Sequence, residues 1–176
     1  MSKQGYIPKN LHFDSEGRQK LISGIEKISN AVKSTLGPRG QTVIIESTEH
    51  LSGMTITKDG VTVARSIFLD DPVENIAIQI MKDASNRTAN SAGDGTTTAI
   101  VLAEAFVKAG LKYMIPNNNT TQVVKHINNI VKDIVKYLEK NSKKITNSSL
   151  LDVAKISANN DAEIGKLIFD AYQKVG

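Results

Sequence analysis

The stretch AGDGTTTA, residues 92–99, places a carboxylate between two glycines and follows it with three threonines. Threonine is β-branched and a mediocre helix former, so three in a row cost helix stability unless their hydroxyls have another use. Glycines permit close approach of the backbone, and a helix beginning here would present free N–H groups and a positive dipole end. The stretch therefore predicts a nucleotide-phosphate site, with Asp94 suited to the accompanying Mg²⁺. A plain turn with Thr96 as N-cap is the alternative that this stretch leaves open.

Apolar residues on both sides of this stretch recur at three- and four-residue steps, the period of amphipathic helices. The pattern predicts long helices over about residues 14–36, 72–90, 96–109 and 120–138, then two shorter helices after the NSS and NND segments. The expected inward-facing residues of the second long helix are Ile76, Ile80, Ala84 and Thr88, and those of the fourth are Val124, Ile127, Val131, Ile134 and Leu138. The expected N-caps are Asp14 or Ser15, Thr120 or Thr121, Ser149 and Asn160.

Strand-like segments lie between the first two long helices. QTVIIE (41–46) predicts a short buried strand, and MTITKDGVTVAR (54–65) predicts two strands joined by a turn at Asp59 and Gly60. The preceding LGPRG segment contains a glycine and a proline that prevent continuation of the first helix. We therefore expect a fold that is mainly α with a small β-hairpin.

The composition narrows the possible chemistry. None of the 176 residues is a cysteine, which excludes disulfides, thiolate nucleophiles and cysteine-ligated metals. The histidines, His12, His50 and His126, have no metal-ligand spacing. The N-terminal residues contain no apolar signal region, and no apolar run approaches membrane-spanning length. We therefore expect a cytoplasmic protein without a targeting segment.

A net charge of +4 leaves nucleic-acid binding as an alternative function. The basic face for it would consist of Lys125, Lys132, Lys136, Lys140, Lys143 and Lys144. Four of these six lysines fall on the polar side of the predicted fourth helix, which favours an ordinary solvated face. Nucleic-acid binding would depend steeply on salt and be indifferent to ATP.

Four motifs together resemble a known family. They are LGPRGQTVIIE (36–46), TKDGVTVAR (57–65), AGDGTTTAIVLAEA (92–105) and ISANNDAEIGKLI (156–168). In this order and at these intervals they closely resemble the amino-terminal part of group I chaperonins, the GroEL type. The resemblance extends from about residue 11 to the end of the chain.

The resemblance implies an ATP-driven protein-folding machine of two stacked sevenfold rings. Each subunit of such a ring has an equatorial, an intermediate and an apical domain. Residues 1–140 would be the amino-terminal half of the equatorial, ATP-binding domain, and residues 141–176 the first leg of the intermediate domain. The apical domain and the rest of the equatorial domain would lie outside this chain. Implied partners are identical subunits in one or two rings, unfolded client proteins and a co-chaperonin lid, in a bacterial-type cytoplasm such as that of a phage host.

The resemblance also implies roles for individual residues. The nucleotide contacts would be Thr35, Leu36, Gly37, Pro38, Lys58, Asp94, Gly95, Thr96, Thr97 and Thr98. Asp94 would hold Mg²⁺, and the backbone carbonyls of Thr35 and Lys58 would help to hold K⁺. Asp59 would help to position the hydrolytic water. Ile156 and Asn159 would lie beside the base and the ribose.

Two segments depart from the family pattern, and the first is the N-terminus, which is several residues longer than usual before LHFDSEG (11–17). IPNNNTT (115–121) replaces the Gly-x-Asn-Pro that usually precedes the fourth long helix. The phosphate motifs are intact. Because the family's second catalytic aspartate lies outside these residues, we expect the 176-residue chain alone neither to hydrolyse ATP at a useful rate nor to refold clients. The alternative function within this family is a structural or assembly part without turnover.

Overall fold

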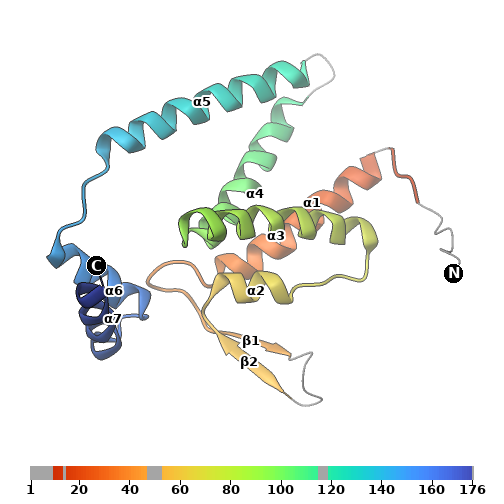
Figure 1. Cartoon of the computed structure of the whole chain (residues 1–176). Coiled ribbons are helices and arrows are strands. Elements are labelled where there is room, and N and C mark those ends of the chain that lie inside the picture. Colours follow the sequence, from red (N-terminus) through yellow and green to blue (C-terminus); the bar gives the residue numbers. More distant parts are fainter. Residues whose placement is uncertain (1–9, 14, 47–52, 115–118, 176) are drawn as a thin grey trace, which may run out of the picture. The chain divides into compact units, whose positions relative to one another are not determined.

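The computed structural model describes residues 10–13, 15–46, 53–114 and 119–175. Its helices are α1 (Ser15–Lys33), α2 (Gly60–Ser66), α3 (Pro72–Ala92), α4 (Thr96–Tyr113), α5 (Thr120–Asn141), α6 (Asn147–Ser157) and α7 (Ala162–Val175), and its strands are β1 (Val43–Glu46) and β2 (Met54–Thr57) (Figure 1). The expected fold class, mainly helical with one small hairpin, is confirmed. The chain forms two compact units, Met1–Asn118 and Asn119–Gly176. None of the described helices combines the length and apolar character needed to cross a bilayer.

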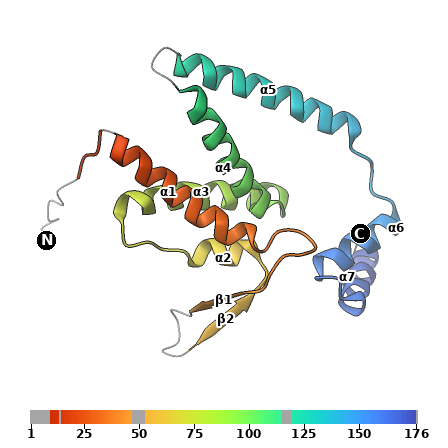
Figure 2. The ribbon, with the colours of Figure 1, turned by 180° about the vertical axis from the view of Figure 1, so that it is seen from behind.

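The core of the first unit lies where α1, α2, α3 and α4 meet (Figures 1 and 2). It is aliphatic, and its buried residues are Ile28, Val32, Val63, Ala64, Ile78, Met81 and Ile100. Each fully buried isoleucine of this kind contributes about 1.5–3 kcal/mol relative to an exposed one. The core therefore joins four helices that come from separate parts of the chain.

The predicted hairpin at Asp59 and Gly60 is wrong. The hairpin instead pairs β1 with β2 in antiparallel register, from Val43 opposite Thr57 to Glu46 opposite Met54, and residues 47–52 between the strands lie outside the described ranges. The segment GVTVARS forms α2, because a helix places Gly60, Val63 and Ala64 on one buried face. Burial of this face outweighs the β-propensity of the valines and threonine.

The predicted inward-facing residues of α3 are also wrong in part. Ile76 and Ile80 are 56% and 62% exposed, whereas Ala77, Ile78, Met81 and Ser85 are buried. Gly24 of α1 explains this choice of face, because a Cβ added there would lie 2.4 Å from the Glu74 carbonyl oxygen. The backbones of α1 and α3 therefore approach closely at Glu74, and the face of α3 that continues through Ile78 and Met81 turns inward, whereas Ile76 and Ile80 face outward.

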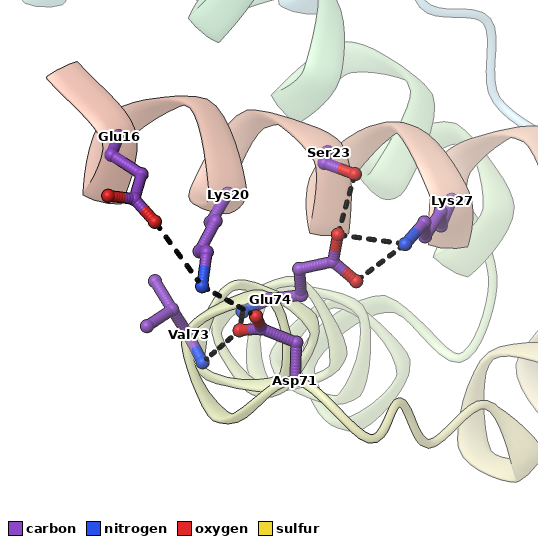
Figure 3. A network of polar contacts seen from close by, with 7 residues as sticks. All are labelled: Glu16, Lys20, Ser23, Lys27, Asp71, Val73 and Glu74. Atoms are coloured by element: carbon purple, nitrogen blue, oxygen red, sulfur yellow. Dashed lines mark hydrogen bonds and ion pairs between the residues drawn. The ribbon is translucent and has the colours of Figure 1, made fainter.

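A polar network joins the first half of α1 to the start of α3 (Figure 3). Lys20 Nζ lies 2.9 Å from an Asp71 oxygen, and Lys27 Nζ lies 2.6 Å from a Glu74 oxygen. Ser23 also donates to Glu74, at 2.8 Å. Hydrogen bonds from Lys20 and from the Glu74 backbone lower the pKa of Asp71 to about 2. The network thus fixes the crossing of α1 over α3 with opposite charges.

Three helix starts differ from the predicted caps. Asn119 caps α5 instead of Thr120 or Thr121, and Thr146 caps α6 instead of Ser149. At α7 the cap is Asp161 instead of Asn160, and its carboxylate accepts hydrogen bonds from two amides of the first turn. At α5 and α6 the capping oxygen comes from a residue that precedes the predicted cap, and at α7 it comes from the residue that follows the predicted cap. In each case this oxygen reaches the free amides of the first turn better than the predicted side chain does. The predicted cap Asp14 of α1 lies outside the described residues, and Ser15 is the first helical residue.

The second unit has little buried surface. No residue of α5 is buried, and its predicted inward-facing Val124, Ile134 and Leu138 are 46%, 47% and 59% exposed. In contrast, α6 and α7 pack closely together, because a Cβ added at Gly165 would lie 2.7 Å from the Lys155 backbone. The turn between these helices uses Asn159 and Asn160 in the left-handed region, at φ 56° and 66°.

Candidate functional site

Three predicted site segments meet at the start of α2. A Cβ added at Gly60 would lie 2.1 Å from Thr97 Oγ1 and 3.1 Å from Thr35 Oγ1. Thr35 follows α1, Gly60 opens α2, and Thr97 lies in the first turn of α4. The fold therefore brings the TLGPRG, TKDG and GDGTTT motifs into contact, and Gly60 leaves the space in which they meet.

The segment after α1 is a closed loop. The Thr35 hydroxyl and its backbone N–H both donate to the Val32 carbonyl, at 2.8 and 3.1 Å. The Gln41 N–H donates to the Ser34 carbonyl at 2.7 Å and closes the loop. Gly37 adopts a positive φ of 77°, which permits the tight turn. The predicted contacts Leu36, Gly37 and Pro38 are consequently exposed on a loop whose two ends are joined.

The connection between α3 and α4 contains two glycines in the left-handed region. Gly93 has φ 74° and Gly95 has φ 82°, and Asp94 between them is exposed. The Gly95 N–H donates to Asp94 Oδ1 at 2.6 Å. Gly95 occupies the N-cap position of α4, and no side chain caps this helix end. The alternative with Thr96 as N-cap is therefore wrong, because Thr96 is the first helical residue.

The first turn of α4 is suited to anionic oxygens. An uncapped helix start presents backbone N–H groups without intrahelical partners, at the positive end of the helix dipole. Thr96 and Thr97 are half-buried there, while Thr98 is exposed. Ser85 of α3 supports this turn by donating its hydroxyl to the Thr96 carbonyl at 3.3 Å. The geometry thus offers amide and hydroxyl donors on one short surface.

Asp59 has a structural task in addition to its predicted role. Its carboxylate accepts hydrogen bonds from the amides of Val61 and Thr62, at 3.2 and 3.0 Å, and caps α2. The Thr62 hydroxyl also donates to it, at 2.6 Å. Burial raises the pKa of Asp59, but the hydrogen bonds from Thr62 and Val61 and the charge of Arg65 lower it overall. Asp59 is therefore an ionised acceptor at neutral pH, suited to orienting a donor more than to retaining a proton.

The donor set fits a magnesium–phosphate pair. Within the described ranges, no three histidine or acidic residues cluster in a way that could hold a metal ion by themselves. Mg²⁺ in nucleotide sites is held by one or two carboxylates together with phosphate oxygens and water. Asp94, exposed beside the uncapped start of α4, is such a single carboxylate.

The remaining predicted residues lie elsewhere. Lys58 is exposed at the end of β2, directly before Asp59. Ile156 and Asn159 belong to the second unit, where Ile156 is 69% exposed and Asn159 lies in the turn after α6, with φ 56°. A hollow on the first unit is lined by residues of the 10–13 segment, α1 and α3, and contains none of the predicted site residues.

Sequence reasoning missed three supporting residues. Gly60 was assigned to a turn, although its function is to admit Thr97. Thr62 and Ser85 were not assigned a role, although they hold Asp59 and Thr96. The Asp-x-x-Thr spacing at 59–62 is a signal for an N-cap and could have indicated the start of α2. The contacts of Gly60 and Ser85 join distant segments and have no local signal.

Comparison with known proteins identifies the family and the fold. The model of the TCP-1/cpn60 chaperonin family matches residues 28–176. The chain is similar to the chaperonin gp146 from the bacteriophage EL 2 (Pseudomonas aeruginosa), determined in the presence of ATP-BeFx, with 29% identity and a TM-score of 0.76. The match covers 90% of this chain and 28% of gp146. A group III chaperonin in the open state shares the fold, with 23% identity, a TM-score of 0.73, and coverage of 91% of this chain and 32% of that one.

Proposed function

The chain belongs to the TCP-1/cpn60 chaperonin family, and we propose that it acts in an ATP-dependent chaperone whose identical subunits form one or two stacked rings. The clients would be unfolded polypeptides, and a co-chaperonin lid would be a further partner. The observation that carries this proposal is the meeting of Thr35, Gly60 and Thr97 at one point. The determination of gp146 with ATP-BeFx supports a nucleotide as the ligand of this family's fold.

The phosphates would bind at the start of α4. The backbone amides and hydroxyls of Thr96, Thr97 and Thr98 are the donors, and Gly95 permits close approach. ATP, when bound, supplies a phosphoanhydride bond whose hydrolysis releases the free energy for work on clients. The chain's own contribution is to position donors and charge, which is the main source of catalysis in phosphoryl transfer.

The remaining roles follow from position and chemistry. Asp94 would hold Mg²⁺ together with phosphate oxygens, and the carbonyls of Thr35 and Lys58 would contribute to K⁺ binding. Asp59 would orient the attacking water through its ionised carboxylate. Ile156 and Asn159 would contact the base and ribose. The loop of Leu36, Gly37 and Pro38 would line the nucleotide.

The wider assignments are part of the same proposal. Residues 1–140 would form the amino-terminal half of the equatorial domain, and residues 141–176 the start of the intermediate domain. The chain spans about 28% of the length of gp146. The phage origin of gp146 supports a bacterial cytoplasm as the working compartment.

The test is an Asp94→Asn variant of the full-length protein. Removing the carboxylate charge takes away the metal ligand, so we expect steady-state ATP hydrolysis to fall at least about 100-fold. Asp83→Asn is the matched control, because Asp83 is an exposed aspartate of α3 outside the site. Its turnover should stay within about twofold of wild type.

Two results would contradict the proposal. One is ATP turnover within twofold of wild type in Asp94→Asn. The other is a wild-type protein that binds ATP but does not hydrolyse it, which would favour the alternative of a structural or assembly part without turnover.

A further inference from the structure

A buried carboxylate lies on the inner face of α4, outside the residues assigned above. Glu104 is only 2% exposed. The fully buried Ile100 lies three residues after Thr97, and Glu104 lies seven residues after Thr97. At this spacing the three residues share one face of α4. This face therefore joins the candidate phosphate site to the core and then to Glu104, about 10 Å further along the helix.

Glu104 pairs with lysines from two helices. Its Oε2 contacts Lys33 Nζ of α1, and its Oε1 lies 2.8 Å from Lys108 Nζ of α4. Lys108 Nζ also lies 2.9 Å from Oε1 of Glu26 in α1. Burial raises the pKa of Glu104, but the hydrogen bonds and charges of Lys108 and Lys33 lower it overall, so it is ionised at neutral pH. The result is a ladder of alternating charge between α1 and α4.

The two lysines differ in what they are attached to. Lys33 is the last residue of α1, and the closed loop begins directly after it with Ser34 and Thr35. Lys108 lies in the middle of α4, a turn beyond Glu104 and further from the start of that helix. Lys108 also links Glu104 to α1, but through Glu26, about two turns before the end of that helix, so the Lys33 contact is the one that lies next to the loop that reaches Gly60 and Thr97.

Stability alone is a weak explanation for a charge at this position. A well-packed apolar residue at a buried site is often as stabilising as an ion pair, because burying charges costs solvation. An ion pair between two helices fixes their register, because the two charged groups come into contact at only one offset of the helices along their axes. The offset of α1 against α4 sets where Thr35 lies relative to Thr97, and misplacement by about 1 Å is enough to impair a binding or catalytic geometry.

We propose that Glu104 is a positioning residue for the nucleotide site, which holds the loop after α1 in register with the start of α4 through Lys33. The proposal rests on the proposed function of that site. It predicts that removing the Lys33 contact loosens the loop and weakens ATP binding, whereas removing the Lys108 contact does neither.

The experiment compares four variants of the full-length protein: Glu104→Gln, Lys33→Met, Lys33→Arg and Lys108→Met. We expect the Kd for ATP, measured by calorimetry, to rise about tenfold in Glu104→Gln and Lys33→Met. Lys108→Met should stay within about twofold and Lys33→Arg near wild type. The double variant Lys33→Met with Glu104→Gln should be no worse than either single variant, because both remove the same contact.

Hydrogen exchange without nucleotide gives a second readout. The Gln41 amide closes the loop by its bond to Ser34. Its exchange should become about tenfold faster in Lys33→Met and stay unchanged in Lys108→Met. A purely structural role would change stability in both lysine variants alike. Lys33 is 39% exposed, so its replacement keeps the test valid even if Glu104→Gln does not fold.

Three outcomes would overturn the proposal. They are equal effects of Lys33→Met and Lys108→Met on Kd, additive effects in the double variant, or unchanged exchange at Gln41 in Lys33→Met. Asp94→Asn, assayed in parallel, separates the two levels of inference. If Asp94→Asn loses ATP turnover while Lys33→Met keeps wild-type affinity, the role of Glu104 fails alone. If Asp94→Asn turns over ATP normally, the nucleotide site fails and the role of Glu104 with it.

Discussion

The starts of α2 and α3 are built alike and are surrounded differently. Asp59 and Asp71 are both N-caps in extended conformation, with φ/ψ of −76°/115° and −72°/119°. Each accepts hydrogen bonds from the amides two and three residues further along the chain. Asp71 also pairs with Lys20, whereas Asp59 accepts from the Thr62 hydroxyl.

An aspartate that caps a helix is therefore not by itself a functional site. Asp71 has its charge balanced by α1 and serves the crossing of two helices (Figure 3). Asp59 precedes Gly60, where Thr35 and Thr97 meet, so it stands one residue from the point at which the three motifs come together. We propose that the same local motif is structural at the start of α3 and available for chemistry at the start of α2.

The largest expected effect is on hydrolysis. Asp59→Asn keeps an oxygen that can cap α2 but removes the charge that would orient water, so we expect kcat for ATP to fall about 100-fold. The Kd for ATP should change less than about threefold, because an acceptor of this kind acts mainly in the transition state. Asp71→Asn, the matched cap, should leave kcat within about twofold. Equal losses of kcat in the two variants would break the comparison.

The next effect uses a glycine from each region. In Gly60→Ala the new methyl group would displace the Thr97 side chain, so we expect the Kd for ATP to rise about tenfold. In Gly24→Ala it would meet the Glu74 backbone of α3 and cost about 1–3 kcal/mol of unfolding free energy. Calorimetry with ATP and urea unfolding, each applied to both variants, would separate the two. A fall in stability with unchanged Kd in Gly60→Ala would contradict the assignment of that region.

The smallest effect is the pH dependence of stability at the start of α3. Because the folded-state pKa of Asp71 is about 2, below its ordinary 3.8, its ionised form stabilises the protein near neutral pH. This contribution is lost as pH falls from about 4 to about 2. Wild type should therefore have a higher urea midpoint than Asp71→Asn at pH 7, and the difference should shrink across that window.

Lys20→Met provides the check on the cause of this shift. Without Lys20 the pKa of Asp71 should rise toward its ordinary value, and the acid-dependent difference should become smaller. A difference between wild type and Asp71→Asn that persists unchanged to pH 2 would contradict the role of the Lys20 pair.

Local signals predicted much of the fold and the family. Apolar periodicity predicted a helix over 72–90, and α3 spans Pro72–Ala92; it also predicted that a helix begins inside the threonine run, and α4 begins at Thr96. The motif resemblance to chaperonins is confirmed by the family match over residues 28–176. These predictions are confirmed because the helix period, the glycine breaks and the short motifs are properties of neighbouring residues.

Two of the failures, the hairpin and the inward face of α3, share one cause. The Asp59–Gly60 hairpin was wrong because burial of Val63 and Ala64 against other helices outweighs local β-propensity. The inward face of α3 was wrong because Gly24, distant in sequence, lets α1 approach α3 at Glu74, on the face that contains Ile78 and Met81. Neither Val63 nor Gly24 carries a local signal of its partner.

The sequence by itself determined the helix periods, the glycine turns that flank Asp94 and the family to which the motifs belong. Only the tertiary structure decided that Thr35 and Thr97 meet at Gly60, that residues 60–66 bury Val63 and Ala64 as a helix, and that Glu104 pairs with Lys33. The physical reason is range. Hydrogen bonds within a turn depend on residues a few positions apart, whereas these contacts depend on how separate helices pack around one aliphatic core.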